Sequence, residues 1–341
     1  MSNSTVRKDT KTRIFSGPRF RHRDTQQRES ILSDPTPELQ KAIAQSRKEF
    51  VATAAALRPR LHRFCTRMCG SVLDGEDVVQ EALAEAFYTL PTLRDSTRFE
   101  PWIFRIAYHK SIDFVRRNKR RQHDTELDDA SHAVIDVDDD LSDAPIDEAL
   151  AMLVGELPAK ERAAVILKDV LDYPLTEVAD IADTTVGGAK AALHRGRSKL
   201  RESSVATAPA VAAFDRDQRR LFNAYAECFN RRDWEGLKHL VRADARLEIV
   251  GENEGAMSTL GATYSGNYTR LPHEWRLSAA IVDGTPAVLH WRRTEATWEP
   301  YSAIRLWWEN GEVVRIRDYI HVGYLLAESH LAAEDKSSAP G

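Results

Sequence analysis

The segment from Arg98 to Arg121, RFEPWIFRIAYHKSIDFVRRNKRR, constrains the fold of this chain more than any other. Its apolar residues recur at the helical period and share one side of a helix with Ser111: Ile103, Phe104, Ala107, Phe114 and Val115. The basic residues of the opposite side are Arg105, His109, Arg116 and Arg120. The pattern predicts a helix with one buried face and one cationic face.

The chemistry of this helix favours a nucleic acid as its partner. The last turn adds Arg117, Lys119 and Arg121, and Phe99 and Trp102 stand at the start. Guanidinium groups neutralise phosphates and aromatic rings stack with unpaired bases, so the combination suits a partly melted strand. A solvated basic face over core aromatics explains any single residue as well, but the whole array favours nucleic acid.

Composition limits the class of protein. The 341 residues leave room for two or three domains, and a hydrophobic content of 42% lets each bury a core. No apolar run approaches the roughly 20 residues of a membrane span, and no apolar signal segment opens the chain, which predicts a cytoplasmic protein without a membrane partner. Cys65 and Cys69 lie near His62 and could hold a metal, but their apolar neighbours favour packed thiols. We therefore expect neither a metal nor a cofactor.

The net charge of -4 hides a strong separation of charge along the chain. Residues 124–148 directly follow the cationic helix and hold eleven Asp or Glu residues with no Lys or Arg. Little apolar periodicity interrupts this run, which predicts a flexible acidic linker. Shielding of the basic face by the linker is the alternative.

Changes of pattern divide the chain into seven segments. We expect a disordered extension at 1–37, a helical domain at 38–122, the acidic linker at 123–145, a second helical domain at 146–203, a linker at 204–213, an α+β domain at 214–335 and a tail at 336–341.

An acidic ridge is predicted on the helix from Asp74 to Leu90. Asp77, Glu81 and Glu85 repeat every four residues opposite its apolar stripe, and the helix has no Lys or Arg to relieve their repulsion. Such a ridge fits docking to a basic partner, and ordinary surface decoration fits equally well.

Two helices joined by a tight turn at Asp183 and Thr184 predict a helix-turn-helix in the second helical domain. The last helix, from Thr185 to about Arg201, carries six basic residues and no acidic one before Glu202, which suits a helix that enters the major groove. Gly187 and Gly188 weaken the start of this helix or allow close approach of its backbone. A generic helical hairpin is the alternative.

Three stretches together resemble extracytoplasmic-function (ECF) sigma factors of bacterial RNA polymerase: DGEDVVQEALAEAF, FEPWIFRIAYHKSIDFVRRNKRR and LPAKERAAVILKDVLDYPLTEVADIADTTVGGAKAALHRGRSKL. The resemblance covers 47–202 and implies a sigma region 2 bundle followed by a region 4 helix-turn-helix. It implies docking on the β′ clamp and β flap of core polymerase, and binding of promoter DNA.

The resemblance also implies roles for individual residues. Those expected to contact polymerase are Asp77, Gln80, Glu81 and Glu85. Those expected to hold and melt the minus 10 element are Phe99, Trp102, Arg105, His109, Arg116, Arg117, Lys119 and Arg120. Those expected at the minus 35 element are Arg162, Thr185, Lys190, His194, Arg195 and Arg197.

The last third of the chain changes to a strand pattern. After an amphipathic helical segment at 214–240, β-branched and aromatic residues alternate between turn signals such as Asp283–Gly284 and Asn310–Gly311. This order predicts a helix followed by a curved antiparallel sheet. The segment resembles SnoaL-like domains of the NTF2-like superfamily, which implies an α+β cone. The residues expected to line a pocket in that cone are Tyr225, Asp244, Trp291, Trp307, Asp318 and His321.

We therefore predict a promoter-specificity subunit without catalytic residues, whose C-terminal domain is a regulatory module that contacts the sigma domains or polymerase. A separate anti-sigma factor is a further expected partner. Two alternatives stay open: a helix-turn-helix factor that works without polymerase, and a cyclase or isomerase that uses Asp318 and His321.

Overall fold

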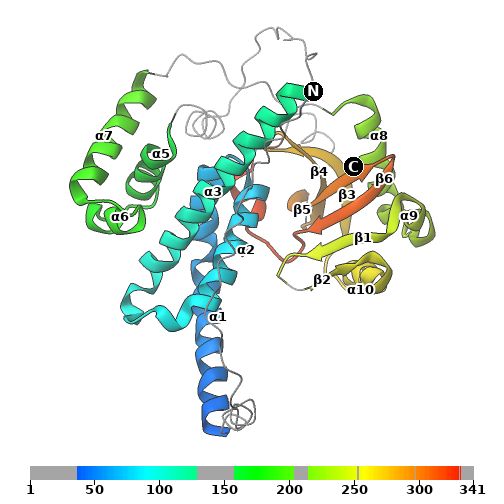
Figure 1. Ribbon diagram of the computed structural model, residues 1–341. Coiled ribbons are helices and arrows are strands. Elements are labelled where there is room, and N and C mark those ends of the chain that lie inside the picture. The colour runs from blue at the N-terminus through cyan, green and yellow to red at the C-terminus, as the bar shows by residue number, and fades with distance from the viewer. Residues whose placement is uncertain are drawn as a thin grey trace, which may run out of the picture. The chain divides into compact units, whose positions relative to one another are not determined.

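The computed structural model describes residues 37–128, 157–202, 214–251, 253–295, 297–329 and 331 (Figure 1). The chain divides into two compact units, Met1–Val51 and Ala52–Gly341, and the boundary falls within the first helix. The packing described below lies in the second unit. The predicted N-terminal extension, the acidic linker beyond Asp128, the helix expected from Ile146 and the C-terminal tail lie outside the described residues. Within the described ranges, no helix combines the length and apolar composition of a membrane span.

The N-terminal helical domain contains α1 (Pro37–Cys69), α2 (Val72–Thr89) and α3 (Phe99–Asp128), with the short 3-10 helices η1 (Leu90–Thr92) and η2 (Ser96–Arg98) between the last two. The Ser71 side chain accepts a hydrogen bond from Asp74 N and caps α2. Gly75 permits α1 and α2 to touch, because a Cβ atom at this position would lie 2.7 Å from Thr66 N. The rings of Phe64 and Phe104 join α1 to α3 with their centroids 5.7 Å apart.

The helix-turn-helix domain contains α5 (Ala159–Val165), the π-helical turn η3 (Ile166–Val170), α6 (Leu175–Ile181) and α7 (Val186–Glu202). The turn between α6 and α7 falls where the sequence predicts it, with Asp183 at a φ of 50°. A Cβ atom at Gly196 would lie 2.8 Å from Val165 Cγ2, so a glycine is needed where α7 crosses α5.

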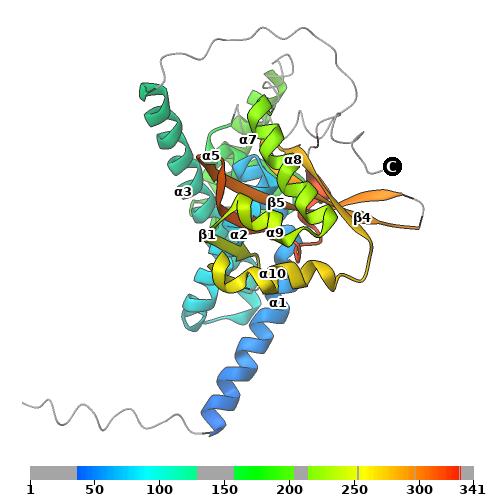
Figure 2. The ribbon, with the colours of Figure 1, turned by 90° about the vertical axis from the view of Figure 1, so that its right-hand side faces the viewer.

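The C-terminal domain is α+β. Helices α8 (Arg216–Arg231) and α9 (Trp234–Leu240) precede β1 (Val241–Ile249), β2 (Asn253–Ala256), α10 (Met257–Thr269), β3 (Trp275–Val282), β4 (Thr285–Arg293), β5 (Trp298–Glu309), β6 (Glu312–Asp318) and the 3-10 helix η4 (Leu325–Glu328). The strands form one sheet in the order β2-β1-β6-β5-β4-β3. In Figure 2, α8, α9 and α10 lie in front of the strands.

The fold confirms the predicted class, two helical domains followed by an α+β domain. Neighbouring strands are antiparallel except β1 and β6, which are parallel, so the sheet is mixed and the prediction of an antiparallel sheet is wrong at this pair. Both predicted hairpin turns are present, with positive φ at Asp283, Gly284, Asn310 and Gly311. Strand β2 and helix α10 were not expected from the sequence.

Two hydrophobic clusters form on the sheet. One includes Phe222 and Phe229 of α8 and Tyr268 of α10. The other contains Tyr319 and Leu325 and also takes in Val72 and Leu73 from the start of α2. The N-terminal helical domain therefore contributes to a core of the C-terminal domain.

Candidate polymerase and nucleic-acid interfaces

Helix α3 has the two faces that its sequence predicts. Ile103, Phe104 and Ala107 are fully buried. The basic residues exposed on its surface are Arg105, His109, Arg116, Arg117 and Arg120. The side chain of Lys119 lies outside the described atoms. A helix anchored along its apolar side thus presents a row of cations to solvent.

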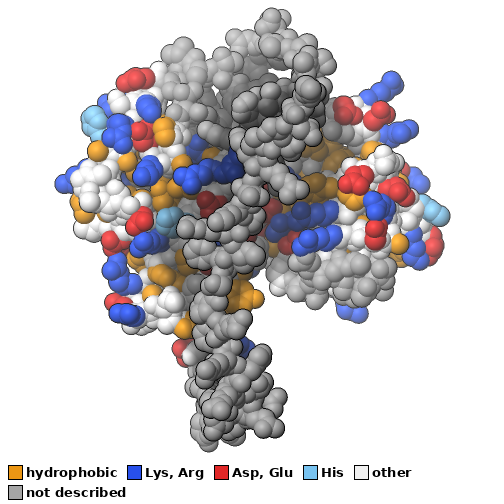
Figure 3. All heavy atoms as spheres, in the orientation of Figure 1, with side chains coloured by type: hydrophobic (Ala, Val, Ile, Leu, Met, Phe, Trp, Pro, Cys, Tyr) orange, Lys and Arg blue, Asp and Glu red, His pale blue; other side chains and the backbone are white. Residues whose placement is uncertain are grey.

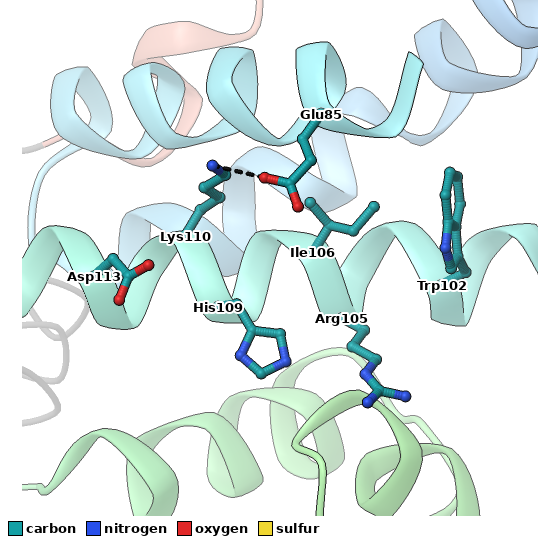
Figure 4. Close-up of a pocket in the computed structure, with 7 residues that line it drawn as sticks. All are labelled: Glu85, Trp102, Arg105, Ile106, His109, Lys110 and Asp113. Atoms are coloured by element: carbon teal, nitrogen blue, oxygen red, sulfur yellow. Dashed lines mark ion pairs between the residues drawn. The ribbon is translucent and has the colours of Figure 1, made fainter. Parts of the chain in front are cut away.

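A hollow of about 320 Å³ opens on the outer surface of α3 (Figure 4). Trp102, Arg105 and His109 stand along it, and Trp102 packs on Phe99 with a centroid distance of 5.9 Å. Lys110 reaches across to Glu85 of α2, with 2.7 Å between Nζ and Oε2. The sequence-predicted aromatic and basic residues at the start of α3 therefore share one surface.

The helix-turn-helix domain lies against the same end of α3. Arg105 Nη2 is 2.9 Å from Asp183 Oδ1 in the turn between α6 and α7, and Arg98 pairs with Asp180. Glu100 accepts a hydrogen bond from the Tyr173 hydroxyl at 2.6 Å. In this arrangement, Arg98 and Arg105, at the start of α3, both have carboxylate partners in the helix-turn-helix domain.

The acidic residues of α2 do not form an unrelieved ridge, and this part of the prediction is wrong. Glu81 and Glu85 are exposed, but Glu81 pairs with Arg117 at 3.4 Å and Glu85 pairs with Lys110. Gln80 is half-buried and donates to Glu76 at 2.7 Å. The basic partners come from α3, which the pattern of α2 alone does not reveal.

Asp77 is held by the C-terminal domain. Its Oδ2 lies 3.0 Å from Arg317 Nη1, and its Oδ1 accepts a hydrogen bond from the Tyr319 hydroxyl at 2.7 Å. One turn earlier, Asp74 Oδ1 is 2.6 Å from Arg305 Nη1. We call Asp74, Asp77, Arg305, Arg317 and Tyr319 the α2 lock.

Further contacts border the α2 lock. The Tyr324 hydroxyl donates to Glu76 at 3.0 Å, and Val72 N donates to Asp283 Oδ2 at 2.7 Å. Arg63 and Arg67 of α1 pair with Glu328 in η4. The contact between the two domains therefore combines an apolar centre with several charged hydrogen bonds.

Burial governs the acidity of these carboxyl groups. It raises the pKa of Asp77 to about 6, although Arg317 opposes the rise. It raises the pKa of Glu76 to about 7 against the opposing effect of Arg58. The charged forms are thus costly to keep in place without their arginine partners.

Helix α7 presents most of the residues expected to contact DNA. Lys190, His194, Arg195 and Arg197 are exposed, whereas Thr185 caps the helix by accepting from Gly188 N at 3.0 Å. Arg195 pairs with Glu161 at 2.8 Å and Arg197 with Asp169 at 2.5 Å, so α5 and η3 orient both guanidinium groups.

Arg162 differs from the other residues of this set. It is 4% exposed and donates to the carbonyl oxygens of Met68 and Leu157 at 2.5 and 3.0 Å. A side chain in this position secures the end of α1 and is inaccessible to DNA, so we leave Arg162 out of the proposed interface.

The six residues expected around a C-terminal pocket do not all come together. Tyr225 and Asp318 are fully buried, and the Tyr268 hydroxyl donates to Asp318 at 2.7 Å. Burial raises the pKa of Asp318 to about 6, and the bond from Tyr268 opposes that rise. Trp291 belongs to the other hydrophobic cluster, where its indole donates to Ser278. The remaining three residues are surface Asp244, half-buried Trp307 and exposed His321.

The structure adds a histidine that sequence reasoning missed. His290 is fully buried on β4, and neither ring nitrogen has a hydrogen-bond partner among the described residues. Its neighbours are the rings of His273 and Tyr301 and the side chain of Ser302, its cross-strand partner. Burial, and to a smaller extent the nearby His273 and Arg292, lower the pKa of His290 to about 3. Strand alternation between Val288 and His290 would have placed it on the inner face.

Metal and thiol chemistry find no support in the described part of the chain. There, no three His, Cys, Asp or Glu residues cluster as metal ligands. Burial raises the pKa of Cys65 and Cys69 above the ordinary range, which disfavours the thiolate form.

Comparison with known proteins identifies both helical domains. Residues 54–121 match the model for Sigma-70 region 2, and residues 147–200 match the model for Sigma-70, region 4. The ECF RNA polymerase sigma factor SigD of Mycobacterium tuberculosis is 30% identical over 172 residues, which cover 48% of this chain and 81% of SigD.

Two further similarities extend into the last third of the chain. SigG of Mycobacterium tuberculosis, also an ECF RNA polymerase sigma factor, is 26% identical over 284 residues, covering 75% of this chain and 77% of SigG. The crystal structure of Mycobacterium tuberculosis ECF sigma factor SigJ covers 79% of this chain and 95% of its own, with 16% identity and a TM-score of 0.31.

A bundle with a cationic, aromatic helix, followed by a helix-turn-helix, defines a promoter-recognition factor of transcription initiation and not an enzyme. The chain belongs to the ECF RNA polymerase sigma factors. Core RNA polymerase and promoter DNA are the partners of this family.

Proposed function

We propose that the C-terminal domain restrains this sigma factor by occupying part of the surface of α2 that docks on the polymerase clamp. The α2 lock is the observation that supports the proposal. It takes Asp77, one of the residues expected to contact polymerase, and leaves Asp77 with 17% of its side chain exposed. Asp77 can then contact either polymerase or the C-terminal domain, but not both at once.

The energetics of buried ion pairs make this restraint specific. Removal of one partner from such a pair leaves an uncompensated charge and costs about 3–5 kcal/mol. Because both domains belong to one chain, the tether keeps the effective concentration near the millimolar range. Competition with polymerase therefore depends on a few arginine contacts.

The DNA-binding roles follow the exposed cations. We assign the minus 10 element to the α3 surface, through Phe99, Trp102, Arg105, His109, Arg116, Arg117, Lys119 and Arg120. We assign the minus 35 element to α7, through Lys190, His194, Arg195 and Arg197, with Thr185 at its start. Release of Arg98 and Arg105 from Asp180 and Asp183 frees two cations for promoter DNA.

In this proposal, Gln80, Glu81 and Glu85 contact the β′ clamp of polymerase. Asp77 joins them when the α2 lock opens. The helix-turn-helix domain contacts the β flap. An anti-sigma factor would act beside the built-in restraint. The protein would work in the cytoplasm, where its polymerase lies.

Run-off transcription with bacterial core polymerase tests the restraint. The Arg305→Gln plus Arg317→Gln variant should bind core polymerase more tightly and give several-fold more transcript than the parent chain. Arg242→Gln plus Arg276→Gln removes the same charge from half-buried Arg242 and exposed Arg276 of the same domain and should change neither quantity. Less transcript from the lock variant would mean that the docked domain assists initiation, and the proposal would be wrong.

A further inference from the structure

The C-terminal domain carries a cationic surface that reaches beyond the α2 lock. On the outer side of the sheet, strand pairing sets two rows next to each other, Arg305, Arg317 and Glu248 in the first, and Trp307, Arg315 and Arg246 in the second. We call these six residues the arginine face. These six residues include four arginines and one glutamate, and β2 continues the first row with Glu254, the register partner of Glu248.

Helix α2 covers the arginine face only in part. Asp74 and Asp77 meet the first row, at Arg305 and Arg317. Arg315 in the second row keeps 35% of its side chain exposed, and Arg246 is exposed. Figure 3 shows Lys and Arg side chains gathered over the strands of the sheet.

Internal contacts hold the arginine face in shape. The Arg305 and Arg315 guanidinium groups stack on Trp307 at 5.1 and 4.5 Å from the ring centroid. Glu248 bridges Arg315 and Arg317 at 3.5 and 3.1 Å. Contacts of this kind restrict the guanidinium groups, and a guanidinium group offers the several N–H donors that suit phosphate oxygens.

Two further observations favour nucleic acid as the partner. When α2 is docked, Asp74 and Asp77 form ion pairs with Arg305 and Arg317. Phosphate groups of DNA could form the same kind of ion pair. The cations of α3 are also close by, because α2 alone separates them: Arg117 pairs with Glu81, one turn from Asp77, and Asp77 pairs with Arg317. A DNA backbone that follows α3 can continue onto the arginine face.

We propose that the arginine face binds the phosphate backbone of DNA, and that the acidic row of α2 competes with DNA for Arg305 and Arg317. This inference rests on the proposed docking of α2 for the first row. The second row contributes whether or not α2 is docked. DNA would thereby help to open the lock and would gain contacts that carry no base sequence information.

Salt dependence of DNA binding by the full chain tests this inference. The probe is a duplex without promoter elements, and the quantity is the slope of log K against log salt concentration. Arg246→Gln plus Arg315→Gln should lower the slope by about 2, because each lost phosphate contact removes about 0.9. Asp74→Asn plus Asp77→Asn should raise it by a similar amount.

Matched controls separate a binding surface from a change in total charge. Arg242→Gln plus Arg276→Gln lowers the net charge equally, away from the arginine face, and should leave the slope within about 0.3 of the parent. An equal drop in this control would overturn the proposal. The proposal would also be overturned if Arg246→Gln plus Arg315→Gln weakened binding to core polymerase and left the DNA slope unchanged. The arginine face would then bind an acidic protein surface.

The two proposals can fail separately. Suppose that Arg305→Gln plus Arg317→Gln leaves transcription unchanged but Arg246→Gln plus Arg315→Gln still lowers the DNA slope. DNA binding by the arginine face is then supported, and the restraint through α2 is wrong. If transcription rises in the lock variants and no DNA slope changes, the restraint stands and DNA binding by the sheet is wrong.

Discussion

The Tyr319 hydroxyl donates a hydrogen bond of 2.7 Å to Asp77 across 242 residues of chain. Tyr319 is fully buried and belongs to the hydrophobic cluster that includes Val72 and Leu73 of α2. This one side chain therefore joins the apolar and the charged parts of the contact between the C-terminal domain and α2.

Tyr319→Phe should weaken that contact without emptying the core. The ring keeps its packing, but Asp77 loses a donor, which costs about 1 kcal/mol, or roughly fivefold in the docking equilibrium. Binding of core polymerase to the full chain measures the change and should become tighter. Tyr301→Phe, which removes the hydroxyl of a ring that packs against His290, should have no such effect.

The sequence predicts what depends on local geometry. The Asp-Gly and Asn-Gly turns, the two faces of α3 and the helix-turn-helix all follow from φ preferences and helical period, and the structure contains them. The contacts of Asp77 could not be predicted in this way. Spacing along α2 identified it as a surface acid, but its partners Arg317 and Tyr319 lie in β6 and directly after it, and no periodicity connects them.

Arg162 and the pairing of β1 with β6 illustrate the same limit. A basic residue near a DNA-binding helix is expected to face solvent, yet Arg162 satisfies carbonyl groups at the end of another domain's helix. The parallel register of Leu247 with Ile316 depends on how the chain closes its sheet over about 70 residues, which alternation within each strand does not encode.

Glu81→Lys should weaken binding to core polymerase. Glu81 is exposed at 45% and belongs to the acidic residues of α2 that the C-terminal domain leaves accessible. Charge reversal opposite a basic partner should cost about 1.4 kcal/mol, or roughly tenfold in Kd. Native-gel or anisotropy titration with core polymerase provides the measurement.

Glu227→Lys is the matched control for Glu81→Lys. It reverses an exposed carboxylate on α8 that also has an arginine partner, Arg231. An equal loss of affinity in both variants would attribute the effect to net charge and would contradict a docking role for Glu81.

Arg116→Ala plus Arg120→Ala should impair open-complex formation more than polymerase binding. Both side chains are exposed on α3, one turn apart, and have no role in its core. Loss of two phosphate contacts on a single strand should lower the salt slope by about 1.4. Permanganate reactivity of unpaired thymines at a promoter reports the melted state directly.

Arg216→Ala plus Arg220→Ala repeats the same spacing on the exposed side of α8 and should leave promoter melting unchanged. If the α3 variant loses polymerase binding and melting to the same extent, the substitutions act through folding of the N-terminal helical domain.

His290→Leu should stabilise the C-terminal domain at pH 8 by about 1–3 kcal/mol, because it replaces a buried ring without hydrogen-bond partners by an apolar side chain. Six of the seven Trp residues lie in this domain, so Trp fluorescence during urea unfolding of the full chain follows it. His239→Leu on the exposed side of α9 controls for the loss of a histidine. A less stable His290→Leu variant would mean that water or a bound molecule satisfies the ring.

The same variant should become relatively more stable in acid. The folded state lowers the pKa of His290 from 6.5 to about 3, so above pH 6.5 the ring is neutral in both states and pH has no effect through it. Below pH 6.5 the unfolded chain takes up a proton that the folded domain excludes, and the parent loses about 2 kcal/mol by pH 5. The raised pKa values of Asp77 and Asp318 act in the opposite direction in both proteins. The difference between variant and parent therefore isolates His290, and a difference that stays constant from pH 8 to pH 5 would place a titrating partner beside the ring.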